Sequence, residues 1–255
     1  MKIVVAMKQA PDLQQIRIRN CQPILEGVPY TFGIIDKNAL EAAVSINEEV
    51  DGEVIVVSAG NEELEDTIKE ALAADADSSI LMVNSQVAEM DSGQIAQVLV
   101  ELIKKADGYD LIIFGEGSGD NYSGLMGSRV AELLELPQVG YVTAIEVSKD
   151  QIAQSQITVK RSLENQDEIL EIQLPAVLVV AADLNKPRIP SVTKVLKAGK
   201  KPKEVFGLEE LQINLGEKQT VTISNLAPLN ERMLGSAIIV PESVAQVANT
   251  VFFQK

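Results

Sequence analysis

The sequence predicts a doubly wound α/β fold with a mostly parallel central sheet. Short runs rich in Val and Ile alternate with amphipathic stretches through residues 1–135, and small residues follow the ends of several runs. The composition, with 46% hydrophobic residues, suits a protein with a compact core. Alternation of strands and helices implies parallel strands joined by right-handed crossovers, with helices on both faces of the sheet.

The first strand is predicted at residues 2–7, and Pro11 interrupts regular structure soon afterwards. Residues 13–35 predict irregular or hairpin structure, because QIRIR alternates and prolines and glycines break the segment. A helix capped by Asp36 then fits the apolar stripe of KNALEAAVSINEEV. A second strand, VIVVSAG, follows at residues 54–60.

The same strand and helix unit then repeats. Residues 61–76 place apolar side chains on one helical face, and SSILMV follows as a third strand at 78–83. Another helix is predicted over residues 91–107, and it leads to a buried strand at 110–114.

A glycine-rich turn, GEGSGDNYSG at residues 115–124, joins this strand to a helix that starts near Met126. Glycines let a ligand approach bare backbone, and the helix start offers unpaired N–H groups and a positive dipole end. Phosphate is therefore the natural ligand. The stretch is neither a GxxxxGK[ST] loop nor a strict GxGxxG fingerprint, so an ordinary structural turn is the alternative.

Small residues end the neighbouring strands on what should be the same edge of the sheet. Ala6, Ala59 and Gly60 hold these positions and outline the floor of a pocket. Within the turn, Asp120 has an alternative role in complementing the helix dipole. Ser123 could donate to phosphate or satisfy the backbone of the turn.

The pattern changes after Pro137, where four strand-like runs follow one another without helical crossovers. Antiparallel additions to the sheet are the simplest interpretation. From residue 184 the chain is rich in Pro and Lys, and a short helix is predicted at 192–196. The tail to Lys255 is expected to lie along another subunit, with a poorly ordered tail as the alternative.

The composition excludes several classes of chemistry. The chain has no histidine, which rules out Ser-His-Asp and Cys-His nucleophiles and histidine-containing zinc sites, and Cys21 has no partner for an internal disulfide. A net charge of -15 disfavours nucleic acid and anionic membranes as partners. The basic run KVLKAGKKPK suggests protein contacts, or a solvated face. Without a long apolar stretch or a signal-peptide pattern, a cytoplasmic protein without membrane insertion is expected.

Four stretches match the motifs of one known family in sequence and spacing. They are VVAMKQAPD, IIDKNALEAA, LIIFGEGSGDNYSGLMGSRVAELLELPQ and the long run VKRSLENQDEILEIQLPAVLVVAADLNKPRIPSVTKVLKAGKKP. Through them the chain resembles the beta subunit of electron transfer flavoproteins along nearly its whole length. The GxGSxDxY form and the IPSVTKVL segment are most similar to the Fix-type branch, associated with anaerobic carnitine or nitrogen-fixation electron transport.

The resemblance implies a Rossmann-like, adenine-nucleotide-binding domain over residues 1–183 and a partner-recognition loop with a short helix at 184–202. It also implies a C-terminal extension at 203–255 that packs on an alpha subunit. One FAD would be held mainly by alpha near the subunit interface. A further nucleotide would lie within this chain, AMP in ordinary members of the family and a second FAD in electron-bifurcating members.

The resemblance also assigns site residues. The nucleotide of this chain would be bound by Ala6, Ala59, Gly115, Gly119, Asp120, Ser123, Gly124, Leu125 and Met126. The family often has Asn, Gln and Thr at the last three of these positions, so binding here would rest mainly on backbone N–H groups. The Asn-Pro pair that precedes the family's first helix is replaced by Gly33 and Ile34.

Other residues would face the protein partners. By resemblance, Asp12, Leu13 and Arg161 lie near the flavin at the interface, although Arg161 could instead pair with Glu164 on a solvated turn. The dehydrogenase-recognition loop would run from Pro190 to Leu196 with Val192 as its anchor; ordinary packing of a short helix is the alternative.

The function that follows is electron carriage between a flavin-dependent acyl-CoA or related dehydrogenase and a downstream acceptor, rather than self-sufficient enzyme catalysis. The cofactor supplies the chemistry, which is compatible with the absence of histidine. An electron-bifurcating subunit with NADH as donor is the alternative within the family. An adenine-nucleotide-binding sensor module is the alternative of another class, and the long extension after residue 184 speaks against it.

Overall fold

The computed structural model describes residues 1–19, 22–213 and 215. The chain divides into two units, which are Met1–Ile16 with Leu25–Thr222, and Arg17–Ile24 with Ile223–Lys255. In the second unit, β3 (Arg17–Arg19) and β4 (Gln22–Ile24) pair as an antiparallel hairpin, as expected for this part of the chain. The packing predicted for the tail lies outside the described residues from residue 216 onward.

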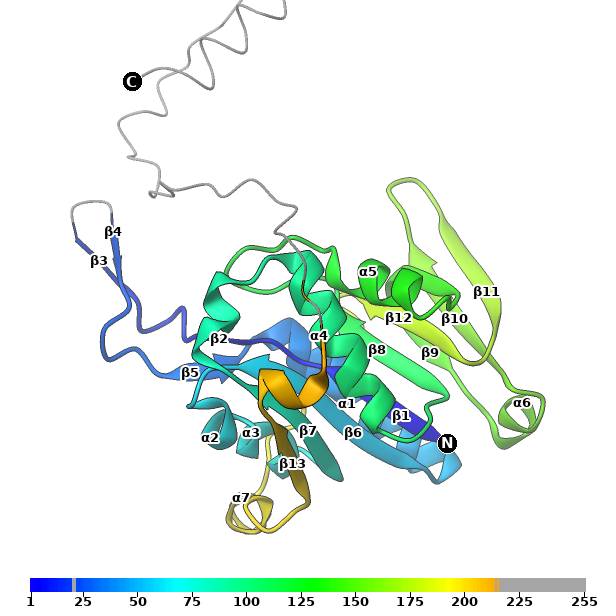
Figure 1. Cartoon of the computed structure of the whole chain (residues 1–255). Helices are drawn as coiled ribbons and strands as arrows, with labels where there is room; N and C mark the ends of the chain where they lie inside the picture. Colours follow the sequence, from blue (N-terminus) through cyan, green and yellow to red (C-terminus); the bar gives the residue numbers. More distant parts are fainter. Residues whose placement is uncertain (20–21, 214, 216–255) are drawn as a thin grey trace, which may run out of the picture. The chain divides into compact units, whose positions relative to one another are not determined.

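The first unit is built on one nine-stranded sheet with the order β11-β10-β9-β12-β8-β1-β6-β7-β13 (Figure 1). Its strands are β1 (Lys2–Ala6), β6 (Glu53–Gly60), β7 (Ser78–Val83), β8 (Leu111–Gly115), β9 (Gln138–Glu146), β10 (Gln156–Ser162), β11 (Asp167–Gln173), β12 (Ala176–Val180) and β13 (Lys203–Phe206). Every pairing in this sheet is parallel except those of β10 with β9 and β11. The predicted mostly parallel sheet is therefore confirmed.

Helices cover both faces of the sheet, as the doubly wound fold requires (Figure 1). They are α1 (Ile34–Val50), α2 (Leu64–Thr67), α3 (Lys69–Ala73), α4 (Ser92–Lys105), α5 (Met126–Leu133), α6 (Lys149–Ala153) and α7 (Val192–Ala198), with 3-10 turns η1 (Ser85–Glu89) and η2 (Leu208–Leu211). Strand β1 divides its side chains between two cores: Ile3 and Val5 pack with α1, α2 and α3, and Val4 and Ala6 pack with α4 and α5. Among the described helices none is long and apolar enough to cross a bilayer.

Strand β12 differs from the expected antiparallel additions. It lies between β8 and β9 and pairs in parallel with both. All five of its residues are buried, which is typical of a central parallel strand rather than an alternating edge strand. The antiparallel additions are thus limited to the pairings of β10.

The first long helix also begins earlier than predicted. Gly33 is the N-cap of α1, and Asp36 lies inside the first turn, where it is buried. Its carboxylate accepts a hydrogen bond from the Lys8 backbone N–H at 3.2 Å instead of capping the helix. By contrast, Asp91 caps α4 through a capping box with Gln94.

Four further features were not anticipated. The helix predicted at 61–76 is divided into α2 and α3. A short helix, α6, begins at Ser148, whose side chain accepts from the Gln151 N–H. Strand β13 extends the sheet beyond β7, and a small antiparallel sheet forms from β2 (Gln9–Pro11) and β5 (Tyr30–Phe32).

Candidate functional site

The order of the strands reverses between β1 and β8. From β1 the chain proceeds to β6 and β7 on one side, then returns to β8 on the other side. In open α/β sheets, ligands bind in the crevice beyond the carboxyl ends of the strands at such a switch point. The glycine-rich turn follows β8 directly, so it borders this crevice.

Several predicted residues meet at this edge of the sheet. Ala6 ends β1 and is opposite Phe114 in β8, while Gly115 ends β8. Ala59 and Gly60 end β6 on the other side of β1. The structure therefore brings the small strand ends together at the switch point, as their positions in the sequence predicted.

The glycine-rich turn contacts the loop that follows β1. Gly119 approaches Leu13, in the turn after β2: a Cβ added to Gly119 would lie 2.9 Å from Leu13 Cδ1, the end of an exposed side chain. Lys8 Nζ forms an ion pair with Asp120 at 2.5 Å and lies 3.4 Å from Ser118 Oγ. The sequence prediction missed Lys8, although a cation just beyond the end of β1 could have marked it as a phosphate ligand.

Two carboxylates beside Lys8 have pKa values that are shifted in opposite directions. Asp36 is only 6% exposed, and burial raises its pKa to about 7 despite the hydrogen bond from the Lys8 backbone. Burial also raises the pKa of Asp120, but hydrogen bonds from Lys8 and Ser118 outweigh it and leave that pKa below its ordinary value. At neutral pH, Asp120 is therefore ionised and neutralises Lys8, and a bound phosphate would compete for this cation.

The predicted recognition segment carries exposed apolar side chains. Val192 is 78% exposed and Leu196 is 75% exposed, and Pro190 precedes them at the start of the segment. Ser191 caps α7 by accepting from the Lys194 N–H. On α7, Val192 and Leu196 are exposed, whereas Ala198 is buried.

Arg161 lies apart from the other residues predicted near the interface flavin. Asp12 accepts from the Gln14 N–H in the turn that contains Leu13, and Leu13 lies against Gly119 of the glycine-rich turn. Arg161 belongs to β10, and β9, β12 and β8 separate that strand from β1 in the sheet. Its guanidinium pairs with Glu168 across β10 and β11 at 2.5 Å, so the expected alternative of pairing with Glu164 is wrong.

Comparison with known proteins places this architecture in a family. The sequence matches the model of the electron transfer flavoprotein domain over residues 24–211. It is 34% identical over 240 residues to the electron transfer flavoprotein subunit beta of Thermoanaerobacterium thermosaccharolyticum, an alignment that covers 91% of this chain and 90% of the relative. The chain belongs to the electron transfer flavoprotein family. Membership gives it an electron-transfer role and confirms the resemblance found in the sequence.

In this member of the electron transfer flavoprotein family, the backbone turns sharply at the crevice before α5 begins. Gly124 adopts a left-handed φ of +64°, and a Cβ there would lie 3.3 Å from the Glu116 carbonyl oxygen. Helix α5 starts at Met126, and its N-cap, Leu125, has an apolar side chain that makes no capping hydrogen bond. The N–H groups of the first turn are thus available to a phosphate. Ser123, beside Gly124, is exposed.

Replacing Lys8 with methionine is expected to weaken nucleotide binding by roughly 10- to 100-fold, the value of one hydrogen bond to a charged group. The variant removes a cation from the crevice and leaves the Asp120 carboxylate unpaired, and both changes disfavour phosphate. Titration calorimetry with AMP measures the change. Lys104→Met is the matched control, since that exposed lysine pairs with Glu101 on α4. An unchanged Kd for Lys8→Met would remove Lys8 from the site.

Proposed function

We propose that this chain is the beta subunit of a heterodimeric electron transfer flavoprotein and carries electrons between a flavin-dependent dehydrogenase and a downstream acceptor. Family membership supports the electron-transfer role, and one structural observation carries the proposal further. The chain has a backbone-lined crevice at the sheet's switch point, and it also has a separate segment with exposed apolar side chains. A nucleotide site and a partner surface on one chain suit a carrier subunit.

The chemistry of transfer belongs to FAD, which accepts and releases electrons and would be held mainly by the alpha subunit near the interface. In this chain, the turn at 115–124 and the start of α5 would hold the second nucleotide through backbone N–H groups. Lys8 would contribute a cation at the crevice. That nucleotide is AMP in an ordinary carrier and a second FAD in a bifurcating one.

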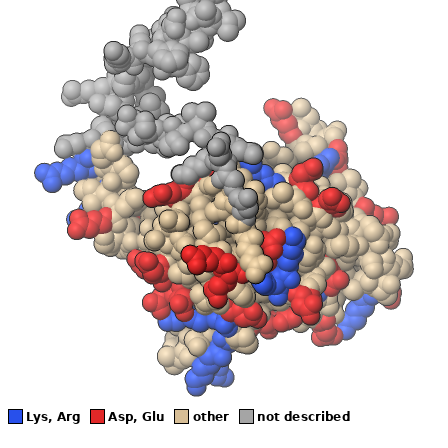
Figure 2. All heavy atoms as spheres, in the orientation of Figure 1, with Lys and Arg blue, Asp and Glu red and all other residues tan. Residues whose placement is uncertain are grey.

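The surface formed by Pro190, Val192 and Leu196 would bind an acyl-CoA dehydrogenase or a related flavoenzyme. Exposed apolar side chains surrounded by lysines provide an anchor with a polar rim, which is the usual arrangement of a binding hot spot. Figure 2 shows acidic side chains spread over much of this face, with a basic group around α7 at the lower end of the view. This basic group would favour a partner with acidic residues around its docking site.

A count of bound cofactors tests the proposal. The chain is co-expressed with its alpha partner, the complex is purified and denatured, and released FAD, AMP and ATP are measured per heterodimer. One FAD and one AMP are expected from a carrier, and two FAD would indicate the bifurcating type. ATP bound to a chain that forms no stable complex with alpha would overturn the proposal in favour of a nucleotide sensor.

A further inference from the structure

The recognition segment is held to the body of the protein by polar contacts more than by packing. Within residues 187–198 only Ala198 is fully buried. Pro187 to Pro190 and Val195 line a cavity of about 450 Å³, which is also lined by Phe32, Leu40 and Ala71. Because the underside of the segment borders a cavity, side-chain packing alone does not fix its conformation.

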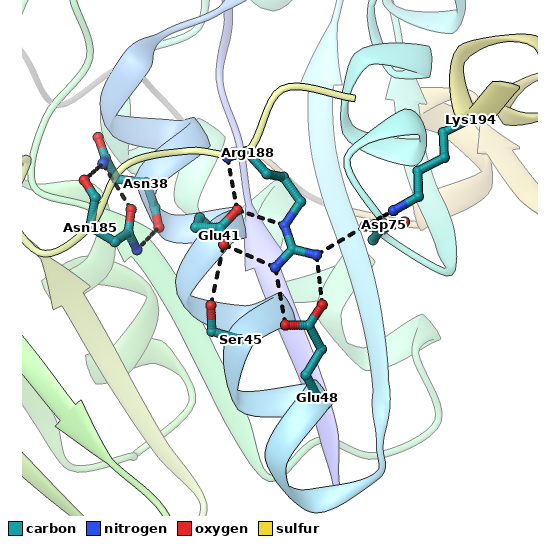
Figure 3. Close-up of polar contacts among 8 residues, drawn as sticks. All are labelled: Asn38, Glu41, Ser45, Glu48, Asp75, Asn185, Arg188 and Lys194. Atoms are coloured by element: carbon teal, nitrogen blue, oxygen red, sulfur yellow. Dashed lines mark hydrogen bonds and ion pairs between the residues drawn. The ribbon is translucent and has the colours of Figure 1, made fainter. Parts of the chain in front are cut away.

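Arg188 makes the most extensive of the polar contacts (Figure 3). Its guanidinium binds both oxygens of Glu41 at 2.8 and 2.9 Å and both oxygens of Glu48 at 2.7 and 3.2 Å. The Arg188 backbone N–H also donates to Glu41 at 2.9 Å. Two bidentate pairs to one helix, α1, define both the position and the orientation of the segment.

Asp75 connects this contact to α7. Its carboxylate accepts from Arg188 Nη1 at 3.0 Å and from Lys194 Nζ at 2.6 Å (Figure 3). The residue lies just after α3 with a φ of 80°, a left-handed conformation that glycine adopts at lower cost. An aspartate is strained in this backbone conformation, but its carboxylate binds both Arg188 and Lys194.

A third contact fixes the chain just before the segment. The Asn38 side-chain amide donates to the backbone oxygen of Asn185 at 2.8 Å, and the Asn185 amide donates to the backbone oxygen of Asn38 at 3.0 Å. Asn38, Glu41 and Glu48 all belong to α1 (Figure 3). The segment is thus attached through Asn185 and Arg188, which precede it, and through Lys194 within α7.

The cluster stays ionised at neutral pH. Burial raises the pKa of Glu41 and of Asp75, but hydrogen bonds from Arg188 to both, and from Lys194 to Asp75, leave both pKa values below their ordinary range. Hydrogen bonding to Arg188 likewise lowers the pKa of Glu48. Three carboxylates and two cations therefore attract one another throughout the physiological range.

We propose that Arg188 and Asp75 are positioning residues for the recognition segment: their ion pairs hold residues 189–196 in the conformation that presents Val192 and Leu196 to the dehydrogenase. The role in binding rests on the proposed function, whereas the role in ordering the segment does not. A segment ordered in advance loses less conformational entropy when it binds, so the ion pairs increase affinity without contacting the partner.

Asp75→Gly separates this role from a general role in folding. Glycine suits the left-handed backbone, so the melting temperature of the heterodimer should not fall, and its nucleotide content should not change. Amide hydrogen exchange over residues 189–196 should accelerate by roughly tenfold or more. With an acyl-CoA dehydrogenase that reduces the unmodified heterodimer, KM for the heterodimer should rise by roughly fivefold or more while kcat stays nearly constant.

Asp51→Gly is the matched control. Asp51 also has a positive φ, 54°, at the end of a helix, and it pairs with a lysine, Lys149, at 2.9 Å. Its replacement should leave exchange at 189–196 and KM unchanged. Arg188→Lys keeps the charge but loses the bidentate hydrogen bonds. It should therefore accelerate amide exchange over 189–196 and raise KM, as Asp75→Gly does.

The outcomes distinguish the two proposals. Unchanged exchange over 189–196 in Asp75→Gly would overturn the positioning role, whatever the kinetics. The heterodimer could instead show faster exchange and an unchanged KM while its electron transfer still depends on Val192. Order in the segment would then not assist binding, and the positioning role would again be overturned. Faster exchange in a heterodimer that no acyl-CoA dehydrogenase reduces would contradict the proposed partner and support the ordering role alone.

Discussion

Replacing Val192 with glutamate is expected to reduce electron transfer from the dehydrogenase by roughly 30-fold or more, the loss of about 2 kcal/mol that is typical of a binding hot spot. Val192 is 78% exposed, so the new charge costs the fold little. In a complex with the partner, the same charge would be buried against apolar surface without a counterion. Steady-state reduction of the heterodimer at varied concentration measures the effect, which should appear mainly in KM.

Val205→Glu provides the control for this substitution. Val205 lies on the edge strand β13, is 41% exposed and follows α7, outside residues 189–196 of the recognition segment. It receives the same change of side chain, and transfer should remain at the level of the unmodified protein. Loss of bound nucleotide in Val192→Glu would indicate misfolding, and an unaltered KM would mean that the dehydrogenase binds elsewhere.

Asp36→Asn is expected to stabilise the protein at pH 8 and to have little effect at pH 4. The carboxyl has a pKa of about 7 in the folded protein against 3.8 ordinarily, so between these values the folded state retains a proton that the unfolded state has released. Stability therefore falls as the pH rises through this window, by up to about 4 kcal/mol. Asparagine remains neutral and removes this dependence.

Urea denaturation at a series of pH values from 4 to 8 measures this effect. The amide oxygen of asparagine can still accept from the Lys8 N–H, but its NH₂ group needs a partner, which could offset about 1–3 kcal/mol of the gain. The slope of stability against pH is therefore the decisive quantity. A slope in Asp36→Asn equal to that of the unmodified protein would show that folding does not raise the pKa of Asp36.

Local patterns in the sequence predicted the elements that local physics determines. The buried strands and most of the helices around them have clear periodicity, and the glycine turn after β8 is visible without any long-range information. Strand β13 was missed because its four residues acquire a strand conformation by pairing with β7, more than a hundred residues earlier. The position of β12 between β8 and β9 likewise depends on partners that the strand itself does not specify.

At the site, too, features set by local sequence could be predicted, whereas contacts with distant residues could not. The small strand ends and the glycine turn could be assigned from sequence, because topology brings carboxyl ends of parallel strands to one edge. The contacts of Lys8 and Arg188 could not, because their partners lie 112 and 147 residues away. Asp36 has the residue type of a helix cap, and only the three-dimensional structure shows that it is buried one turn further in.

Helix α1 serves two regions at once. Asp36 in its first turn contacts the loop at the nucleotide crevice, whereas Glu48 near its end binds Arg188 of the recognition segment. With a rise of 1.5 Å per residue, these positions are about 18 Å apart on one rigid rod. A substitution that tilts α1 would thus impair cofactor retention and partner choice together. Variants with substitutions in α1 should therefore lose cofactor retention and partner binding together. A measurement of activity alone would not show which of the two regions caused the defect.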